Sequence, residues 1–273
     1  MPYASPLERV WYWVFRLICG AVLLFLIAPI LVVMPLSFNA EPYFSYPMPG
    51  LSLQWYQDLV NNPQWQLGIR NSLIVGACAT VLATTLGTLA ALGLSQRKFP
   101  MRTLVMSVLI SPMIVPVVIT AVGMYFFYSD IGLTNTLPGL ILAHTALATP
   151  FVVITVTATL TAFDHSMTRA AANLGASPWT AFRLVQLPLI LPGVISGALF
   201  AFVTSFDEVV VVLFIAGPEQ RTLPRQMFAG IREQISPTIL AAACILVAIS
   251  IALLTTIELL RRRSERLRGV SPA

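Results

Sequence analysis

The chain consists of long runs of apolar residues separated by short polar segments. Six runs are long enough to cross a bilayer, since about 20 helical residues span the roughly 30 Å of hydrocarbon. We expect spans at Leu17–Phe38, Ser72–Ser95, Thr103–Tyr128, Leu137–Leu160, Leu189–Ala216 and Thr238–Leu260. The runs show no alternation of apolar and polar residues, so transmembrane strands are excluded and helices remain. The pattern predicts an all-α integral membrane protein with six spans in one transmembrane domain, residues 1–273.

Prolines and small residues inside these runs predict where the helices bend and where they touch. Pro112 and Pro116 fall within the third run and predict kinks, which a bundle tolerates when neighbours satisfy the freed carbonyls. Ala83, Gly87 and Ala91 recur at four-residue spacing in the second run. Small residues at this spacing let helix backbones approach closely, so we expect this face to pack against another helix.

The charged residues are few and unevenly distributed between the two sides of the predicted bundle. They make up 10% of the chain, against about 25% in soluble domains. One side holds Arg9, Arg16, Arg97, Lys98, Arg102, Arg169, Arg183, Arg261, Arg262, Arg263, Arg266 and Arg268; the other holds Arg70, Arg221, Arg225 and Arg232. The positive-inside rule therefore places both termini in the cytoplasm. The net charge of +5 is then a topology signal and a contact for lipid headgroups, not a nucleic-acid footprint.

The sequence contains no pattern for catalysis, nucleotide binding or metal binding. A P-loop needs a Gly-rich segment ending in Gly-Lys-Ser/Thr, and Lys98, the one lysine, does not lie in such a segment. His144 and His165 are the only histidines, and no ligand partners occur at suitable spacing. We expect His144 to make a hydrogen bond between helices. We predict a protein that is not an enzyme and holds no metal or cofactor.

A segment of small and polar residues between the fourth and fifth runs differs from the rest of the chain. An alanine cluster favours a helix that Gly175 ends, and Ser177 and Pro178 are a good N-cap and first residue for a second helix. We expect Leu187-Pro188 and Pro192-Gly193 to end that second helix before the next apolar run begins. The predicted cytoplasmic loop, 161–188, is thus a helix, a glycine turn and a helix.

The spacing of this loop resembles the EAA loop of bacterial ABC-transporter permeases. In those proteins the loop seats in a cleft of a separate ATPase subunit as a coupling helix, and the ATPase binds ATP and Mg²⁺. The resemblance implies an ATPase-coupling set of Arg169, Ala170, Ala171, Leu174, Gly175, Ala176, Trp179 and Phe182. The alanines and Gly175 would permit close approach, and the larger apolar side chains would fill the cleft or brace the loop. Arg169 stands where the family usually has Glu, which removes any salt bridge made by that Glu.

A wider resemblance reaches from Arg70-Asn71-Ser72-Leu73 to Thr222-Leu223-Pro224. Phe206-Asp207-Glu208, followed by the segment 214–218, is similar to the inner-membrane permeases of the spermidine/putrescine type. Membership of that family implies a bacterial inner-membrane importer with two ATPase copies, a second homologous permease and a substrate-binding protein outside. It implies transport of a small cationic amine by alternating access; an amino-acid-like amine is the alternative.

Two carboxylates inside the fifth run carry the strongest chemical signal. An ionised carboxylate within a bilayer is costly unless it faces water, a cation or a partner charge. Asp207 and Glu208, with Phe206, are therefore candidates for the substrate path, and at least one carboxylate would help a cation to cross. The alternative is a pair of packing or gating carboxylates bonded within the bundle. The sequence does not decide between the two acids.

Three further questions remain open: the role of the first outer loop, transport driven by an ion gradient, and a scaffold role without transport. Trp55 and Tyr56 lie in an amphipathic stretch of the first outer loop, either as interfacial anchors or as a docking surface for an external partner. A secondary transporter driven by an ion gradient would show inverted repeats, which we do not find. A membrane scaffold without conduction would leave the two carboxylates without a role.

Overall fold

The computed structural model describes residues 5–96, 99–161, 163–164, 166–233 and 236–267, with the backbone alone at Glu233, 253–254 and 256–267. Arg97, Lys98, His165 and Arg268 lie outside the described residues. The helices are α1 (Pro6–Leu36), α2 (Gln54–Asn61), α3 (Pro63–Leu94), α4 (Arg102–Ile114), α5 (Val117–Asp130), α6 (Leu137–Thr161), α7 (Ser166–Asn173), α8 (Pro178–Ala181), the π-helix η1 (Phe182–Gln186), α9 (Leu187–Phe206), α10 (Val210–Ile215), α11 (Leu223–Glu233) and α12 (Thr238–Leu267).

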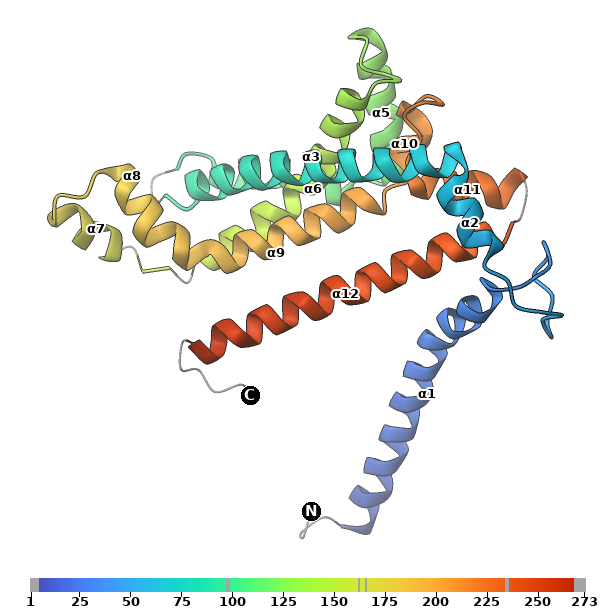
Figure 1. Cartoon of the computed structure of the whole chain (residues 1–273). Helices are drawn as coiled ribbons and strands as arrows, with labels where there is room; N and C mark the ends of the chain where they lie inside the picture. The colour runs from blue at the N-terminus through green and yellow to red at the C-terminus, as the bar shows by residue number, and fades with distance from the viewer. Residues whose placement is uncertain (1–4, 97–98, 162, 165, 234–235, 268–273) are drawn as a thin grey trace. The chain divides into compact units, whose positions relative to one another are not determined.

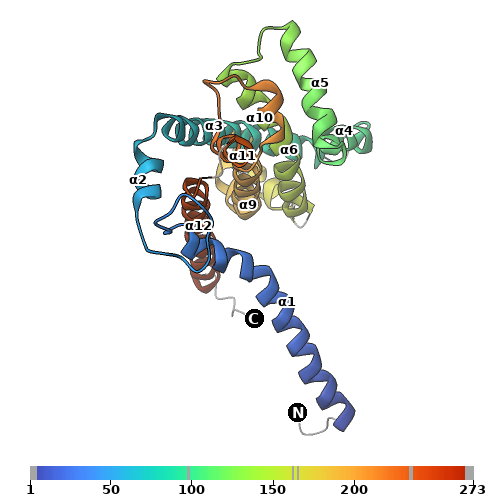
Figure 2. The ribbon, with the colours of Figure 1, turned by 90° about the vertical axis from the view of Figure 1, so that its right-hand side faces the viewer.

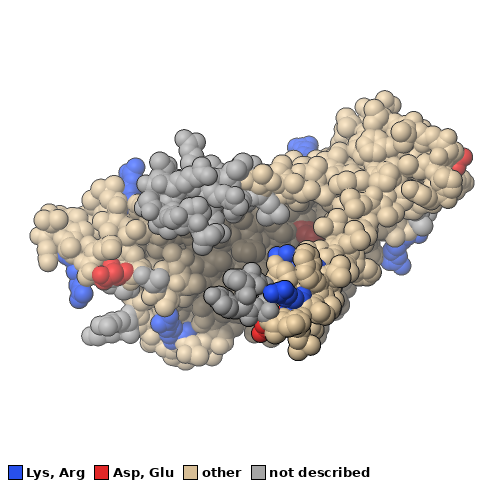
Figure 3. Space-filling model, turned by 90° about the horizontal axis from the view of Figure 1, so that it is seen from below, with Lys and Arg blue, Asp and Glu red and all other residues tan. Residues whose placement is uncertain are grey.

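The chain forms two compact units, which we describe separately. Unit 1 comprises residues 1–62 and 229–273, and unit 2 comprises residues 63–228. Apart from an isolated bridge between Asn39 and Leu51, the described residues contain no β-structure. The prediction of an all-α fold is confirmed. Most of the surface in Figure 3 is neither acidic nor basic, in keeping with a chain that is 10% charged.

Unit 2 is built on α3, α6 and α9, which lie side by side (Figures 1 and 2). Their contact faces consist of small residues, as predicted for Ala83, Gly87 and Ala91, all of which are buried. A Cβ added to Gly87 would come within 2.7 Å of Val152 Cβ on α6. One added to Gly197 on α9 would come within 3.0 Å of the Val152 backbone. The glycines thus let the three backbones approach as closely as they do.

The described helices include four that are long and apolar enough to cross a membrane: α1, α3, α6 and the stretch Pro178–Phe206. The third predicted span is not one straight helix. It consists of α4 and α5, which meet at a 103° bend at Val115–Pro116 and together could make a fifth span. Pro116 cannot donate an amide hydrogen bond, and it holds the preceding residue in the extended region, so the helix ends there. Of α12, the described apolar part is Thr238–Ala252.

Unit 1 contains α1, α2 and α12. Trp55 Nε1 donates a hydrogen bond to Asn39 O at 2.6 Å, and Tyr56 OH lies 2.8 Å from Ser37 Oγ. Both residues are half-buried, and these bonds fasten α2 to the loop after α1. Thr238 Oγ1 donates to Asp58 Oδ2 at 2.8 Å, which ties α2 to the first residue of α12.

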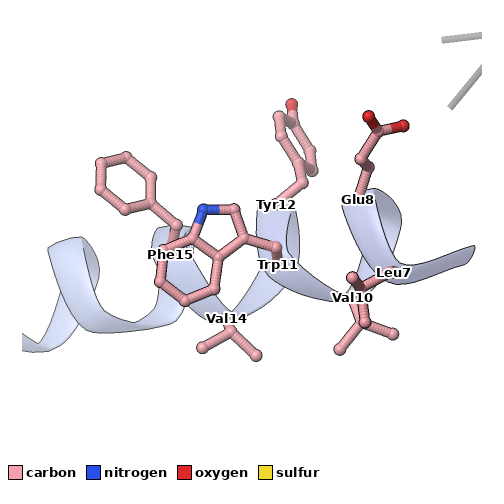
Figure 4. A pocket seen from close by; sticks show the side chains of 7 residues that line it. All are labelled: Leu7, Glu8, Val10, Trp11, Tyr12, Val14 and Phe15. Atoms are coloured by element: carbon pink, nitrogen blue, oxygen red, sulfur yellow. The ribbon is translucent and has the colours of Figure 1, made fainter. Parts of the chain in front are cut away.

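The N-terminal part of α1 exposes large apolar side chains. Figure 4 shows a shallow groove on this helix, lined by Leu7, Glu8, Val10, Trp11, Tyr12, Val14 and Phe15. The Trp11 side chain is 64% exposed and that of Phe15 55%. Because one helix supplies every lining residue, the groove is the outer surface of a membrane helix and not an enclosed cavity.

Candidate functional site

The segment 166–186 forms one end of unit 2, and α10 lies at the other end of the bundle (Figure 1). The first helix of segment 166–186, α7, ends in a Schellman turn: Ala176 N donates to Ala171 O and Gly175 N donates to Ala172 O, both at 3.0 Å. Gly175 has φ +85°, a conformation that side-chain-bearing residues rarely adopt. The glycine turn predicted at this position is confirmed.

The second helix begins as predicted but does not end as predicted. Ser177 is the N-cap, its hydroxyl accepting from Thr180 N at 3.2 Å, and Pro178 is the first helical residue. The expected end at Leu187-Pro188 and Pro192-Gly193 is wrong, because α8 continues through η1 into α9, which runs to Phe206. Leu187 N bonds to Phe182 O five residues back, so the turn ahead of Pro188 is wide. A widened turn accommodates a proline that a regular helix would exclude.

The predicted coupling residues lie close together on α7, α8, η1 and the turn between them, and most of them are exposed. α7 packs against α8 and η1, and the Trp179 and Phe182 rings contact each other in a tilted arrangement with centroids 5.6 Å apart. Leu174 is 89% exposed and Trp179 is 67% exposed. Arg169, Ala170 and Gly175 are also exposed, whereas Ala171, Ala176 and Phe182 are half-buried. Exposed apolar side chains gathered on a polar segment are typical of a protein-binding surface.

The fifth predicted span, Leu189–Ala216, is interrupted at its two carboxylates. α9 ends at Phe206 and α10 begins at Val210, so Asp207 and Glu208 lie in a break and not on a continuous helix. Hydropathy does not indicate this break, since apolar residues continue on both sides. The adjacent acids were the available signal, because acidic residues favour the first turn of a new helix.

The break gives the two acids different surroundings. Glu208 Oε1 accepts a hydrogen bond from Val211 N at 2.9 Å, so this carboxylate caps α10. Asp207 is exposed, and its carboxylate has no hydrogen-bond or ion-pair partner in the part of the chain that the structure describes. It stands at the C-terminal end of α9, where free carbonyl groups carry partial negative charge. The Asp207 carboxylate and these carbonyls together favour a cation.

Phe206, the third residue of the predicted path, has a packing role. Its ring stacks on Phe202 with a centroid distance of 5.4 Å, and both rings lie close to Gly76 of α3. Phe206 is half-buried. The stacked pair therefore fixes the end of α9 against α3 beside the exposed Asp207.

Two polar residues outside the predicted path bond to the ends of the helices on either side of the break, His144 to the last turn of α9 and Arg225 to the far end of α10. The predicted interhelical bond of His144 is confirmed: its Nδ1 lies 2.8 Å from Ser205 Oγ on α9. Arg225 donates to Ala216 O at 2.6 Å and to Gly217 O at 3.1 Å, which satisfies the carbonyl end of α10. Burial, with the nearby Arg221, lowers the pKa of Arg225 below its usual range.

Asn71 and Ser72 tie the start of the second predicted span to the segment after α10. Asn71 Nδ2 donates to Glu219 O at 2.8 Å and to Arg221 O at 3.0 Å. Ser72 Oγ accepts from Leu223 N at 2.8 Å. These bonds join the two ends of the region over which the sequence resembles polyamine permeases, and they hold the start of α11 against α3.

Comparison with known proteins gives consistent matches. Residues 83–266 match the family described as "Binding-protein-dependent transport system inner membrane component". The chain is 33% identical over 240 residues to the spermidine/putrescine transport system permease protein PotC of Haemophilus influenzae, covering 88% of this chain and 93% of that protein.

Solved structures show the same fold at low identity. A bacterial ABC transporter involved in the import of the acidic polysaccharide alginate matches with a TM-score of 0.73 at 15% identity, over 96% of this chain and 99% of that chain. A structure of the bacterial alginate ABC transporter in complex with an alginate pentasaccharide-bound periplasmic protein matches with a TM-score of 0.69 at 16% identity, over 90% and 93%.

Proposed function

The chain belongs to the inner membrane components of binding-protein-dependent transport systems, and we propose that it carries a small cationic amine, such as putrescine or spermidine, into the cytoplasm. It is a multi-pass permease of the bacterial inner membrane. The family match supports an ABC importer over the carrier driven by an ion gradient. The observation that carries the choice of a cation is the break at Asp207, where a free carboxylate meets the negative end of α9.

We propose six spans with both termini in the cytoplasm. The four long helices, the bent pair α4–α5 and α12 would supply them. The uneven distribution of the basic residues supports this orientation, with twelve of the sixteen on one side. The segment 161–188 then lies in the cytoplasm, and the break at Asp207 lies towards the outer side.

Energy for transport would enter through the segment around Gly175. The chain has no P-loop, so ATP and Mg²⁺ would be bound by two copies of an ATPase subunit. The exposed Leu174 and Trp179 would seat in the ATPase, with the Gly175 turn fixing the angle between α7 and α8. Closure of the ATPase pair on ATP would pull this structure inward and open the bundle outward.

Substrate would arrive on a periplasmic binding protein and pass between this chain and a second, homologous permease. The related alginate transporter was solved in complex with a substrate-loaded periplasmic protein, which supports such a partner. In the path, Asp207 would attract the ammonium group of the amine. Glu208 would hold the start of α10 and contribute to the path only through that position.

The test is uptake of labelled putrescine by the complete importer in liposomes with ATP inside. Asp207→Asn keeps the size of the side chain and removes its charge, and we expect at least a tenfold loss of initial rate. Glu208→Gln is the matched control, because its amide oxygen can still accept from Val211 N and cap α10. Wild-type uptake by Asp207→Asn would refute the path. Competition by unlabelled amino acids, but not by polyamines, would favour an amino-acid-like amine as substrate.

A further inference from the structure

A buried hydrogen bond joins α6 to the last turn of α9, two residues before Asp207. His144 Nδ1 lies 2.8 Å from Ser205 Oγ, and the two residues are 1% and 5% exposed. The partners are 61 residues apart in the chain, so this bond holds two different helices together. Its position makes it a restraint on the end of α9, from which Asp207 extends.

The imidazole is costly where it stands. Its Nε2 is buried and has no hydrogen-bond partner among the described residues. The neighbouring positions on α6, Leu140, Ala143 and Leu147, are buried apolar residues. An unpaired polar atom in such surroundings lowers stability, and an apolar side chain of similar size would fill the space at less cost. Stability therefore does not account for a histidine at this position.

The packing around the break indicates what the bond provides. One apolar cluster includes Ile190 and Ala201 of α9, and a separate cluster includes Val211 and Ile215 of α10. Neither cluster includes a residue of the break itself, 207–209. Since apolar packing is non-directional, a hydrogen bond with fixed geometry is the better means of setting how the last turn of α9 is oriented.

We infer that His144 is a positioning residue: its Nδ1 bond to Ser205 fixes the end of α9 and so directs the Asp207 carboxylate into the substrate path. This inference rests on the proposed function. His144 does not need to touch the substrate, because its effect passes through Ser205. The unpaired Nε2 lowers the stability of the fold, and this loss accompanies the placement of Nδ1 within hydrogen-bond distance of Ser205 Oγ.

The experiment uses the complete importer in liposomes, supplied with saturating putrescine-loaded binding protein. His144→Met fills the space without a hydrogen bond, so the permease should unfold at a higher temperature while putrescine turnover falls at least threefold. His144→Asn places its amide where Nδ1 stands, and turnover should stay within twofold of the wild type. Ser205→Ala should match His144→Met, and the double variant should be no slower than either single variant, since all three lack the same bond.

Thr145→Ala is the control for loss of a buried polar group. Its hydroxyl bonds within its own helix, to Ile141 O at 2.6 Å, so turnover should not change. The inference is overturned if His144→Met keeps wild-type turnover, or if His144→Gln restores turnover and His144→Asn does not. Asp207→Asn, assayed alongside, separates the two proposals: if it impairs uptake while His144→Met does not, only the positioning role fails. If Asp207→Asn has no effect, both fail.

Discussion

Substituting alanine for Gly175 is expected to uncouple ATP hydrolysis from uptake in the assembled importer. Gly175 has φ +85°, and among the described residues no heavy atom beyond its chain neighbours lies within 4 Å of the place where a Cβ would stand. The change therefore brings no clash within this chain, and its effect is backbone strain alone. A residue with a Cβ pays about 1–2 kcal/mol in the left-handed region. At about 1.4 kcal/mol per factor of ten, the native turn loses about 5- to 30-fold in population against its alternatives.

The assay measures substrate taken up per ATP hydrolysed by the importer in liposomes. Gly175→Ala should lower this ratio, because α7 and α8 no longer meet the ATPase at a fixed angle. Gly175→Asn should fall between alanine and the wild type, since asparagine tolerates the left-handed region better than other residues with a Cβ. ATP hydrolysis itself should continue, because in the proposed function that reaction takes place in the ATPase subunits.

Two other glycines serve as matched controls. Gly132, which follows α5, has φ +71° and nothing within 4 Å of its Cβ position, so Gly132→Ala carries the same strain outside the coupling segment. It should lower the thermal unfolding midpoint as Gly175→Ala does, with an unchanged transport ratio. Gly123 lies in α5 with open space and no positive φ, so Gly123→Ala should be neutral or stabilising. Our reasoning is refuted if Gly175→Ala keeps the wild-type ratio, or if Gly132→Ala lowers it equally.

Further predictions concern the hydrogen bonds of Arg225 to the carbonyls after α10 and the close contact between α9 and α6. Arg225→Gln removes the donor that reaches the carbonyls after α10, and should cost about 1–3 kcal/mol of stability, seen as a lower unfolding midpoint in detergent; an unchanged midpoint would show that water replaces the guanidinium. Gly197→Val should cost about 1–3 kcal/mol by overpacking, because even a Cβ would meet Thr155 Oγ1 at 2.6 Å. Adding Thr155→Ala should recover part of that loss and not all, since the Val152 backbone lies within 3.0 Å as well.

Local chemistry made the structure of segment 166–186 predictable. The turn at Gly175, the cap at Ser177 and the first helical residue Pro178 each follow from side-chain and backbone preferences that act within a few residues. The small-residue face of α3 was predictable for a similar reason, since Ala83 and Gly87 recur at the helical repeat. Such signals do not depend on where the rest of the chain folds.

Features that depend on tertiary contacts were not predictable in the same way. Pro116 indicated a bend, but its 103° angle depends on how α5 packs against α10. Pro188 suggested the end of a helix, yet the π turn ahead of it lets the helix continue. The break at Asp207 lay hidden in an apolar run, and the bond between His144 and Ser205 joins residues that no local pattern connects.

The uninterrupted helical path from Pro178 to Phe206 has a mechanical consequence. No loop separates the exposed Trp179 from the buried Ser205, so a displacement of one end of this helical segment is transmitted to the other. The π-helix η1 sets how far α8 is rotated about the helix axis relative to α9. Deleting a single residue from η1 would rotate α8 relative to α9 by about 100° and shorten the helical segment by about 1.5 Å. Such a permease would keep every side chain of the proposed ATPase contact and of the proposed substrate path. The Asp207 carboxylate would nevertheless point away from the path whenever the ATPase holds α8 in its native orientation.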